Sequence, residues 1–254
     1  MDVTTVDGQL RITFDRPESM NAFTPEAAQE LASAVEGANV EDHDAVMLTG
    51  EGEAFSAGGD IQSMAEREET PREAYDRVHE TLGRVVEAML ECRVPIVAKV
   101  NGDAVGAGLA ITALSDFAYA TEDATFSCAF VHVGLIPDTG GSFLLPRLVG
   151  LRAAKRLAFT GEFFEAAEAA DLGLLNGAVP PEELDERVDD LLATLADRPT
   201  ETIGLAKQTI HDNLGRQWPD AIDHEIMLQV QAYGTDAHEE GVAAFLDDRD
   251  PEFE

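Results

Sequence analysis

Basic residues are scarce in this chain of 254 residues. It has 17 lysines and arginines against 50 aspartates and glutamates, so its formal net charge at pH 7 is −33. A nucleic-acid-binding surface needs a basic face to neutralise phosphates, so we expect no nucleic-acid partner. The acidic residues are scattered and 44% of the residues are hydrophobic, which excludes a disordered acidic chain. The composition favours a folded protein from a halophile, because concentrated salt screens repulsion between carboxylates.

Cysteines and long apolar runs are also scarce. The two cysteines, Cys92 and Cys128, form no disulfide or metal-binding pattern, so we expect no metal site and a reducing, cytoplasmic location. No apolar run is long enough to cross a membrane, and no basic segment followed by an apolar one begins the sequence, so we expect no signal peptide. No lysine follows a glycine, as a P-loop requires, and no Gly-x-Ser-x-Gly elbow of a hydrolase is present.

Alternating strand and helix signals predict an α/β fold. The residues from Val3 to Phe14 alternate around Asp7-Gly8, which indicates a hairpin. Thr24 and Pro25 open a helix that runs to about Gly37.

Later elements continue the α/β pattern and then change to helix. Thr70 and Glu73 form a capping box that starts a long helix. Strands at 95–100 and 115–120 flank a helix at about 106–114, and the chain from 181 to 248 is almost wholly helical. We therefore expect an α/β core at 1–195 and a helical region at 196–254.

Two glycine-rich turns each join a strand to a helix. Ala-Phe-Ser-Ala-Gly-Gly-Asp at 54–60 follows an apolar strand, and Asn-Gly-Asp-Ala-Val-Gly-Ala-Gly at 101–108 follows another. The start of a helix presents free backbone N–H groups and the positive end of its dipole. Two such turns pointed at one centre would form an oxyanion hole.

A third segment, at 134–150, places the carboxylate of Asp138 among apolar residues and glycines. Burial among such neighbours would raise its pKa and suit it to moving a proton near neutral pH. The alternative is an N-cap, since Asp138 precedes Thr139-Gly-Gly and a helical run. The two glycine-rich turns favour the catalytic interpretation.

Together these segments resemble the crotonase (enoyl-CoA hydratase/isomerase) superfamily nearly end to end. The resemblance begins at Phe-Asp-Arg-Pro-Glu-Ser-Met-Asn-Ala (14–22), includes both turns and Pro-Asp-Thr-Gly-Gly (137–141), and ends in the tail at 240–246. It implies a spiral core of repeated ββα units and a C-terminal helical appendage at 196–254 that forms homotrimers or dimers of trimers. It also implies acyl-CoA thioester substrates and no separate cofactor, because coenzyme A is part of the substrate.

The resemblance assigns functions to particular positions. It implies that the N–H groups of Gly59 and Ala107 bind the thioester oxygen. The positions that it implies for substrate binding are Met20, Ala22, Ala57, Gly58, Asp60, Ile61, Gly106 and Phe130.

The sequence departs from the hydratases of this superfamily at their two catalytic glutamates, which fall at Ala110 and Phe130. Asp138 remains, and Pro-Asp-x-Gly-Gly is most similar to the branch that isomerises ring-opened phenylacetyl-CoA epoxide. A dehalogenase branch for chlorinated aryl-CoA substrates also has an aspartate there, used as a nucleophile. The leading hypothesis is an isomerase with Asp138 as acid and base. An enoyl-CoA hydratase of fatty-acid or aromatic degradation and a non-catalytic acyl-CoA-binding scaffold remain as alternatives.

Overall fold

The structure, a computed structural model, describes residues 1–253 and contains two β-sheets. The larger sheet has the strand order β1-β2-β3-β5-β7-β10, and the smaller has the order β4-β6-β8-β9. Only the pairs β1/β2 and β8/β9 are antiparallel in these sheets. The strands are β1 (Asp2–Val6), β2 (Gln9–Phe14), β3 (Ala45–Gly50), β4 (Ala54–Ser56), β5 (Ile96–Val100), β6 (Asp103–Val105), β7 (Phe117–Thr121), β8 (Thr125–Ser127), β9 (Phe163–Glu165) and β10 (Gly177–Val179).

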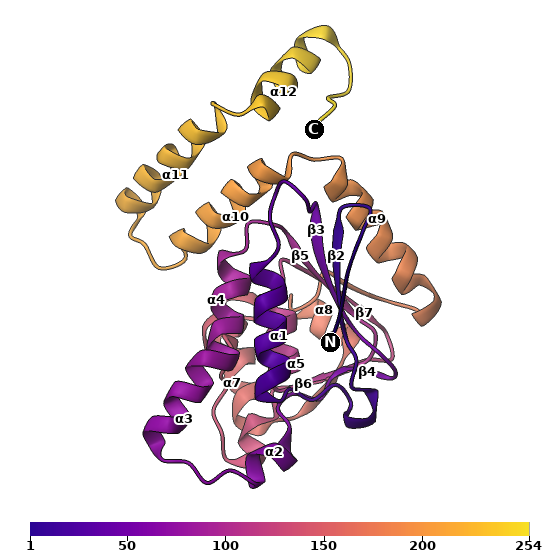
Figure 1. Cartoon of the computed structure of the whole chain (residues 1–254), viewed down its shortest axis with the longest axis vertical. Helices are drawn as coiled ribbons and strands as arrows, with labels where there is room; N and C mark the ends of the chain where they lie inside the picture. Colours follow the sequence, from indigo (N-terminus) through magenta and orange to yellow (C-terminus); the bar gives the residue numbers. More distant parts are fainter. Residues whose placement is uncertain (254) are drawn as a thin grey trace.

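Helices cover the sheets and make up the C-terminal part of the chain (Figure 1). Short 3-10 turns lie at Pro17–Ser19, Ala129–Val133 and Pro181–Glu183, and a π-helical turn lies at His79–Gly83. The α-helices are α1 (Pro25–Glu36), α2 (Ile61–Ala65), α3 (Pro71–Val78), α4 (Arg84–Glu91), α5 (Ala107–Leu114), α6 (Gly141–Leu148), α7 (Gly150–Thr160), α8 (Ala166–Asp171), α9 (Leu184–Ala196), α10 (Thr200–Asn213), α11 (Trp218–Ala232) and α12 (Asp236–Asp247).

The core is built from a repeated unit. The pairs β3/β4, β5/β6 and β7/β8 each give their first strand to the larger sheet and their second to the smaller sheet, and helical structure follows each pair. The central strands β3 and β5 of the larger sheet read as nearly continuous apolar runs, as parallel strands buried on both faces do. This is the α/β fold of ββα units that the sequence predicts.

Local signals place the ends of the N-terminal elements. Asp7 and Gly8 adopt φ angles of 48° and 76°, as a two-residue hairpin turn requires. The Thr24 side chain caps α1 by accepting from the Ala27 N–H at 3.2 Å. The capping box of Thr70 and Glu73 is present, so these three predictions are confirmed.

The long helix that starts at Thr70 contains an interruption that the sequence analysis did not anticipate. A π-helical turn separates α3 from α4. Inside this turn the hydroxyl of Thr81, which is buried, donates to the carbonyl of Arg77 at 2.7 Å. A side-chain hydroxyl that competes for a helix carbonyl commonly bends a helix.

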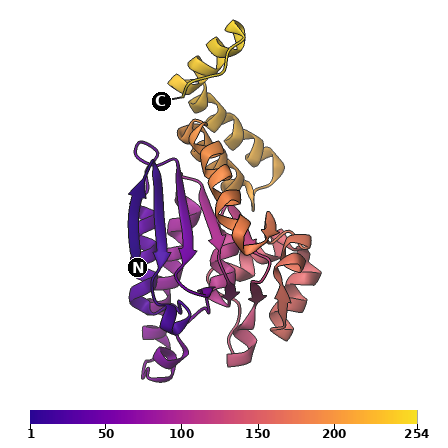
Figure 2. The ribbon, with the colours of Figure 1, turned by 90° about the vertical axis from the view of Figure 1, so that its right-hand side faces the viewer.

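The C-terminal helices divide into a packed part and a projecting part. Leu184, Val188 and Leu192 of α9 are buried against Val97 and Tyr119 of the larger sheet. Helices α10 to α12 then lead away from the core, and α11 and α12 project beyond it (Figures 1 and 2). Among the residues described, no helix is both long enough and apolar enough to span a membrane.

Candidate active site

The two glycine-rich turns lie against each other at the edge where β4 and β6 end. Gly58 has a φ of 89°, and a methyl group on it would lie 2.6 Å from the Val105 carbonyl oxygen and 3.2 Å from the Ala107 nitrogen. Both the backbone angle and the lack of space therefore require glycine at this position. The tertiary fold thus brings together the two turns that the sequence analysis singled out.

The peptide group between Gly58 and Gly59 has a defined orientation. Its carbonyl oxygen accepts a hydrogen bond from the Phe23 N–H at 2.6 Å. In a trans peptide the N–H points opposite to the C=O, so the Gly59 N–H points away from Phe23. Within residues 1–253 no backbone acceptor pairs with the Gly59 N–H.

Ala107 supplies a second unpaired donor. It is the first residue of α5, so its N–H has no acceptor within the helix. The preceding carbonyl, that of Gly106, accepts from the Ala110 N–H at 3.0 Å and is directed along the helix. The N–H groups of Gly59 and Ala107 thus lie on adjoining turns, and we call them the donor pair.

Apolar side chains lie beside the donor pair. Phe130 is buried, and its Cζ atom would lie 4.0 Å from a methyl group on Gly106. A Cβ atom on Gly59 would collide with the Cε atom of Met64, so the end of that side chain lies next to Gly59. Donors next to apolar groups that exclude water stabilise a developing negative charge more strongly than donors in water.

The loop that carries Asp138 packs on α5, the helix that begins at the donor pair. A methyl group on Gly140 would lie 3.1 Å from Leu114, and one on Gly141 would lie 3.8 Å from the Cβ atom of Ala110. Thr139 adopts a φ of 50°, which is rare for a β-branched residue. Such strain persists only where surrounding contacts impose it, and it is common at functional sites.

The carboxylate of Asp138 has few polar partners. Burial raises its pKa above the ordinary value of 3.8, while the Thr139 hydroxyl, which donates to Oδ1 at 2.9 Å, opposes the shift. The sequence predicted that the pKa of Asp138 would be raised, and this direction is confirmed. The alternative, that Asp138 is the N-cap of the helix that follows it, is wrong. Gly140 is the N-cap of that helix, α6, and no side chain caps it.

The expected source of this burial was wrong in part. Leu135, Ile136 and Phe143, which flank Asp138 in the sequence, are exposed, and the Ile136 residue is 79% accessible. The 3-10 turn at Ala129–Val133 leads into a loop whose first residues, Gly134 to Ile136, are exposed, whereas Thr139 further along it is buried. The contacts with α5 that bury this loop come from residues distant in the sequence.

The segments expected to bind coenzyme A are adjacent. The Ala57 N–H donates to the Met20 carbonyl at 2.8 Å, and the Asp60 N–H donates to the Phe23 carbonyl at 3.0 Å. Met20 and Ile61 are apolar and more than half exposed, at 57% and 54%. The structure thus holds the two predicted segments, 20–22 and 57–61, side by side, with Met20 and Ile61 exposed, Ala22 half-buried and Gly58 buried.

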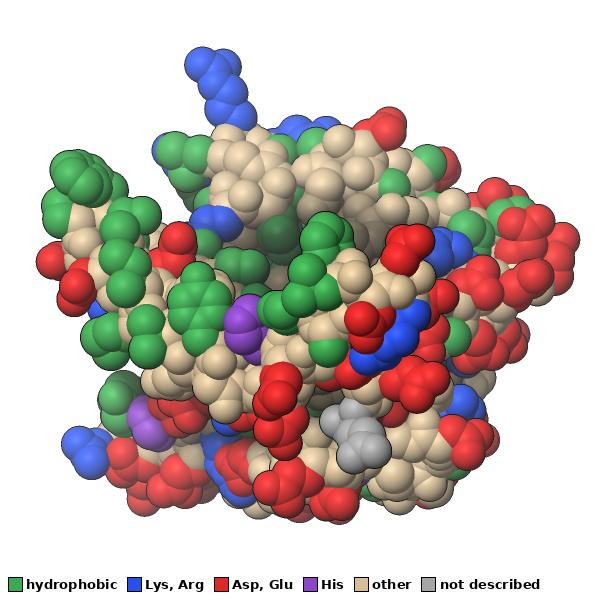
Figure 3. Space-filling model, turned by 90° about the horizontal axis from the view of Figure 1, so that it is seen from above, with side chains coloured by type: hydrophobic (Ala, Val, Ile, Leu, Met, Phe, Trp, Pro, Cys, Tyr) green, Lys and Arg blue, Asp and Glu red, His purple; other side chains and the backbone are tan. Residues whose placement is uncertain are grey.

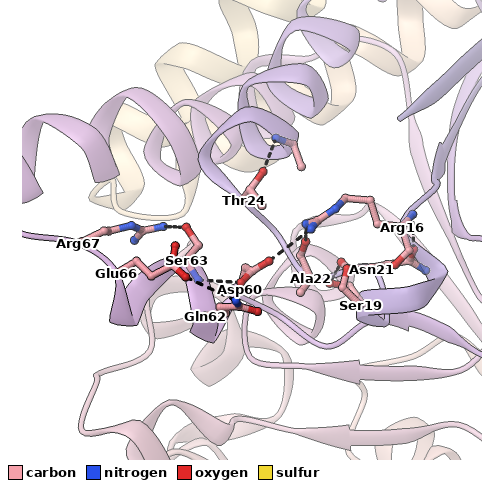
Figure 4. A network of polar contacts seen from close by, with 12 residues as sticks. Arg16, Ser19, Asn21, Ala22, Thr24, Asp60, Gln62, Ser63, Glu66 and Arg67 are labelled. Atoms are coloured by element: carbon pink, nitrogen blue, oxygen red, sulfur yellow. Dashed lines mark hydrogen bonds and ion pairs between the residues drawn. The ribbon is translucent and has the colours of Figure 1, made fainter.

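Asp60 also has a structural function that the sequence analysis did not assign. Its Oδ1 atom accepts from the Ser63 N–H at 2.9 Å and caps α2, and its Oδ2 atom lies 3.4 Å from Nη2 of Arg16 (Figure 4). The Ser63 N–H and, to a lesser extent, Arg16 hold the pKa of Asp60 below its ordinary range.

Three further residues shape the site, and the sequence did not predict them. Arg16 and Asn21 both lie in the quoted motif at 14–22, which was the available signal, but no function was assigned to either. Thr139 follows Asp138 directly, and only the structure reveals its hydroxyl bond to the carboxylate.

Two main-chain donors on adjoining turns, with a partly buried carboxylate on a loop that packs against the helix beginning at Ala107, are the features expected of the crotonase class. The chain belongs to the enoyl-CoA hydratase/isomerase family, whose sequence pattern it matches over residues 5–254.

Individual relatives carry different activities in their names. The chain is 36% identical over 251 residues to a Rhodobacter capsulatus protein described as "Probable enoyl-CoA hydratase", covering 97% of this chain and 95% of that protein. It is 33% identical over 250 residues to the 1,2-epoxyphenylacetyl-CoA isomerase of Escherichia coli, again covering 97% and 95%. The crystal structure of an enoyl-CoA hydratase from Mycobacterium smegmatis superimposes with a TM-score of 0.90 at 31% identity and covers 99% of this chain and 97% of that one. Family membership therefore leaves the choice between hydratase and isomerase open.

Proposed function

We propose that this protein is an acyl-CoA thioester isomerase that uses Asp138 as its proton shuttle. The observation that carries the proposal is a partly buried carboxylate with a raised pKa, on a loop that packs against the helix beginning at Ala107. Ala110 and Phe130 stand where the resemblance places the two glutamates of a hydratase, and neither side chain can move a proton.

The proposed reaction is a proton shift. Ionised Asp138 removes a proton from the carbon next to the thioester, and the electron pair of that C–H bond moves into an enolate. The N–H groups of Gly59 and Ala107 stabilise the charge on the enolate oxygen, each by about 3–4 kcal/mol. Asp138, now protonated, returns the proton to a more distant carbon, so one carboxylate serves both steps.

An enoyl-CoA hydratase that uses Asp138 alone is the second candidate, and the name of the R. capsulatus relative favours it. Hydration must activate a water molecule as well as protonate carbon. Phe130 places an apolar ring near the donor pair, and a buried water needs polar partners. The similarity to the E. coli isomerase supports the first candidate.

The experiment that separates these candidates compares kcat/KM for hydration of crotonyl-CoA with kcat/KM for isomerisation of 3-hexenoyl-CoA, in one high-salt buffer. The proposal expects isomerisation to be faster. Hydration faster by tenfold or more would overturn it and would reassign Asp138 as a hydratase acid. Binding of coenzyme A with no turnover of 2-enoyl, 3-enoyl or ring-opened aryl thioesters would instead indicate a non-catalytic scaffold.

We also propose that copies of this chain cover the projecting helices α11 and α12 in a homotrimer or dimer of trimers. Apolar side chains are exposed along these helices, and Figure 3 shows green side chains gathered on one arm of the molecule while red carboxylates spread over the rest of that face. Those more than half exposed are Trp218, Ile226, Met227, Val230, Tyr233, Phe245 and Leu246. Light scattering in high salt should give three or six times the chain mass of 27.3 kDa, and a monomer would contradict the proposal.

A further inference from the structure

The segment from Arg16 to Phe23 is held in an unusual conformation beside the donor pair. Met20 and Asn21 have φ angles of 50° and 56°, so two consecutive residues other than glycine are left-handed. The buried Asn21 side chain donates to the carbonyls of Glu51 and Ala54 at 2.9 and 2.7 Å. These bonds fasten the segment to the chain that leads into the glycine-rich turn at 54–60.

The guanidinium of Arg16 forms the end of a chain of polar groups. Its Nη1 atom donates to the carbonyl oxygen of Ala22 at 2.6 Å (Figure 4). The same peptide group carries the Phe23 N–H, which donates to the Gly58 carbonyl at 2.6 Å. The Gly58 peptide in turn carries the Gly59 N–H, one member of the donor pair. A positive charge is therefore joined to a proposed oxyanion donor through two peptide groups.

Each link in such a chain strengthens the next. A donor at a carbonyl oxygen draws electron density toward that oxygen, which makes the N–H of the same peptide a better donor. An ionised donor does this more strongly than a neutral one. The Arg16 charge thus polarises the Ala22–Phe23 peptide and, through it, the Gly58–Gly59 peptide, and the Gly59 N–H becomes more positive.

The side chain of Arg16 is also held in place. Its Nη2 atom lies 3.4 Å from Oδ2 of Asp60. The Asp60 side chain is only 16% exposed and is itself fixed as the cap of α2. The Asp60 N–H donates to the Phe23 carbonyl, so both peptide groups of Gly59 are anchored to the same strand-like residue. The arrangement fixes the direction of the Gly59 N–H as well as its polarity.

We propose that Arg16 is a positioning residue that orients and polarises the Gly59 N–H through the peptide groups of Ala22–Phe23 and Gly58–Gly59. This inference rests on the proposed function, because it assumes that Gly59 binds the thioester oxygen. Arg16 acts through the main chain and touches no reacting atom.

The test measures the donor pair directly. Butanoyl-CoA enriched in carbon-13 at its carbonyl is bound to the full-length protein, and the carbonyl resonance is compared with that of the free ligand. Donors that polarise the carbonyl move its resonance downfield. The wild-type protein should show this shift. Arg16→Met, whose side chain is also long and unbranched but has no charge and no hydrogen-bond donor, should show a smaller one.

Kinetics and binding supply the second readout. In Arg16→Met, kcat for 3-hexenoyl-CoA should fall tenfold or more, while the dissociation constant of coenzyme A should change less than threefold. Arg84→Met is the matched control, because Arg84 also pairs with a carboxylate, Glu36, but lies on α4 away from the donor pair. It should leave the carbonyl shift and kcat unchanged.

A further pair of variants keeps the proposal testable if Arg16→Met does not fold. Both Arg16→Lys and Arg16→Gln carry a hydrogen-bond donor, but only lysine is charged. The proposal expects the lysine variant to retain more of the downfield shift than the glutamine variant, and equal shifts would overturn it.

Other outcomes separate this inference from the proposed function. A wild-type shift that persists fully in Arg16→Met would overturn the function of Arg16 and leave the donor pair intact. A coenzyme A dissociation constant that rises tenfold with kcat unchanged would make Arg16 a substrate ligand instead. A wild-type carbonyl that resonates where the free ligand does would contradict the donor pair and both proposals with it.

Discussion

Replacing Asp138 by asparagine should separate activity from stability, because the two change in opposite directions. The substitution keeps the shape of the side chain and removes its ability to take and return a proton. General acid–base catalysis contributes about 10²- to 10⁴-fold to rate, so the transition state should lose about 2.7–5.4 kcal/mol of stabilisation. The measurement is kcat for isomerisation of 3-hexenoyl-CoA, with the dissociation constant of coenzyme A as the binding control.

The same variant should be more stable than the wild type at neutral pH. Burial raises the pKa of Asp138 above its ordinary 3.8, so the folded state binds this proton more tightly than the unfolded state does. The associated stabilisation is complete below the unfolded pKa and is lost as the pH rises through the raised pKa. Above that pH the folded protein holds a desolvated carboxylate, whereas the asparagine variant holds a neutral amide.

Melting temperatures of both proteins across pH 4 to 8 test this sign. The stability advantage of Asp138→Asn should be largest at high pH and should shrink toward pH 4. Asp123→Asn, which removes an exposed aspartate between β7 and β8, is the control for the loss of one charge. The reasoning fails if the asparagine variant retains a tenth or more of kcat, a loss of no more than about 1.4 kcal/mol. A stability difference that does not depend on pH would refute the burial of the charge.

Three further predictions concern the donor pair, the carboxylate and the surface. Ala107→Pro removes a donor and should abolish activity, while Ala107→Gly should be tolerated. Circular dichroism must show that the proline variant folds, and full activity in that folded variant would contradict the donor pair. Thr139→Ala removes the hydroxyl bond that opposes the raised pKa of Asp138, so the acid limb of the kcat profile should move to higher pH, whereas Thr139→Ser should leave it in place. With a net charge of −33, the melting temperature should rise between about 0.1 and 3 M KCl, and a flat or falling value would exclude adaptation to salt as the reason for the composition.

The sequence by itself determined those features that depend on neighbouring residues. Thr24 and Thr70 each bond to a backbone N–H three positions away, so a short window of sequence contains both partners. Asp7-Gly8 specifies its turn because few residues tolerate positive φ. The two glycine-rich turns and the aspartate were recognisable for the same reason, and their order in the chain led to the correct fold class.

Only the tertiary structure decided what surrounds the site. Gly58 meets Ala107 because β4 and β6 are neighbours in the smaller sheet. Asp138 is partly buried because its own loop packs on α5, whereas its apolar neighbours in the sequence are exposed. The chain of polar groups from Arg16 to Gly59 joins residues 16, 22–23 and 58–59, whose distance in sequence hides their contact. Capping and turn formation are satisfied within a few residues, whereas burial and the direction of an N–H depend on which segments the sheets bring together.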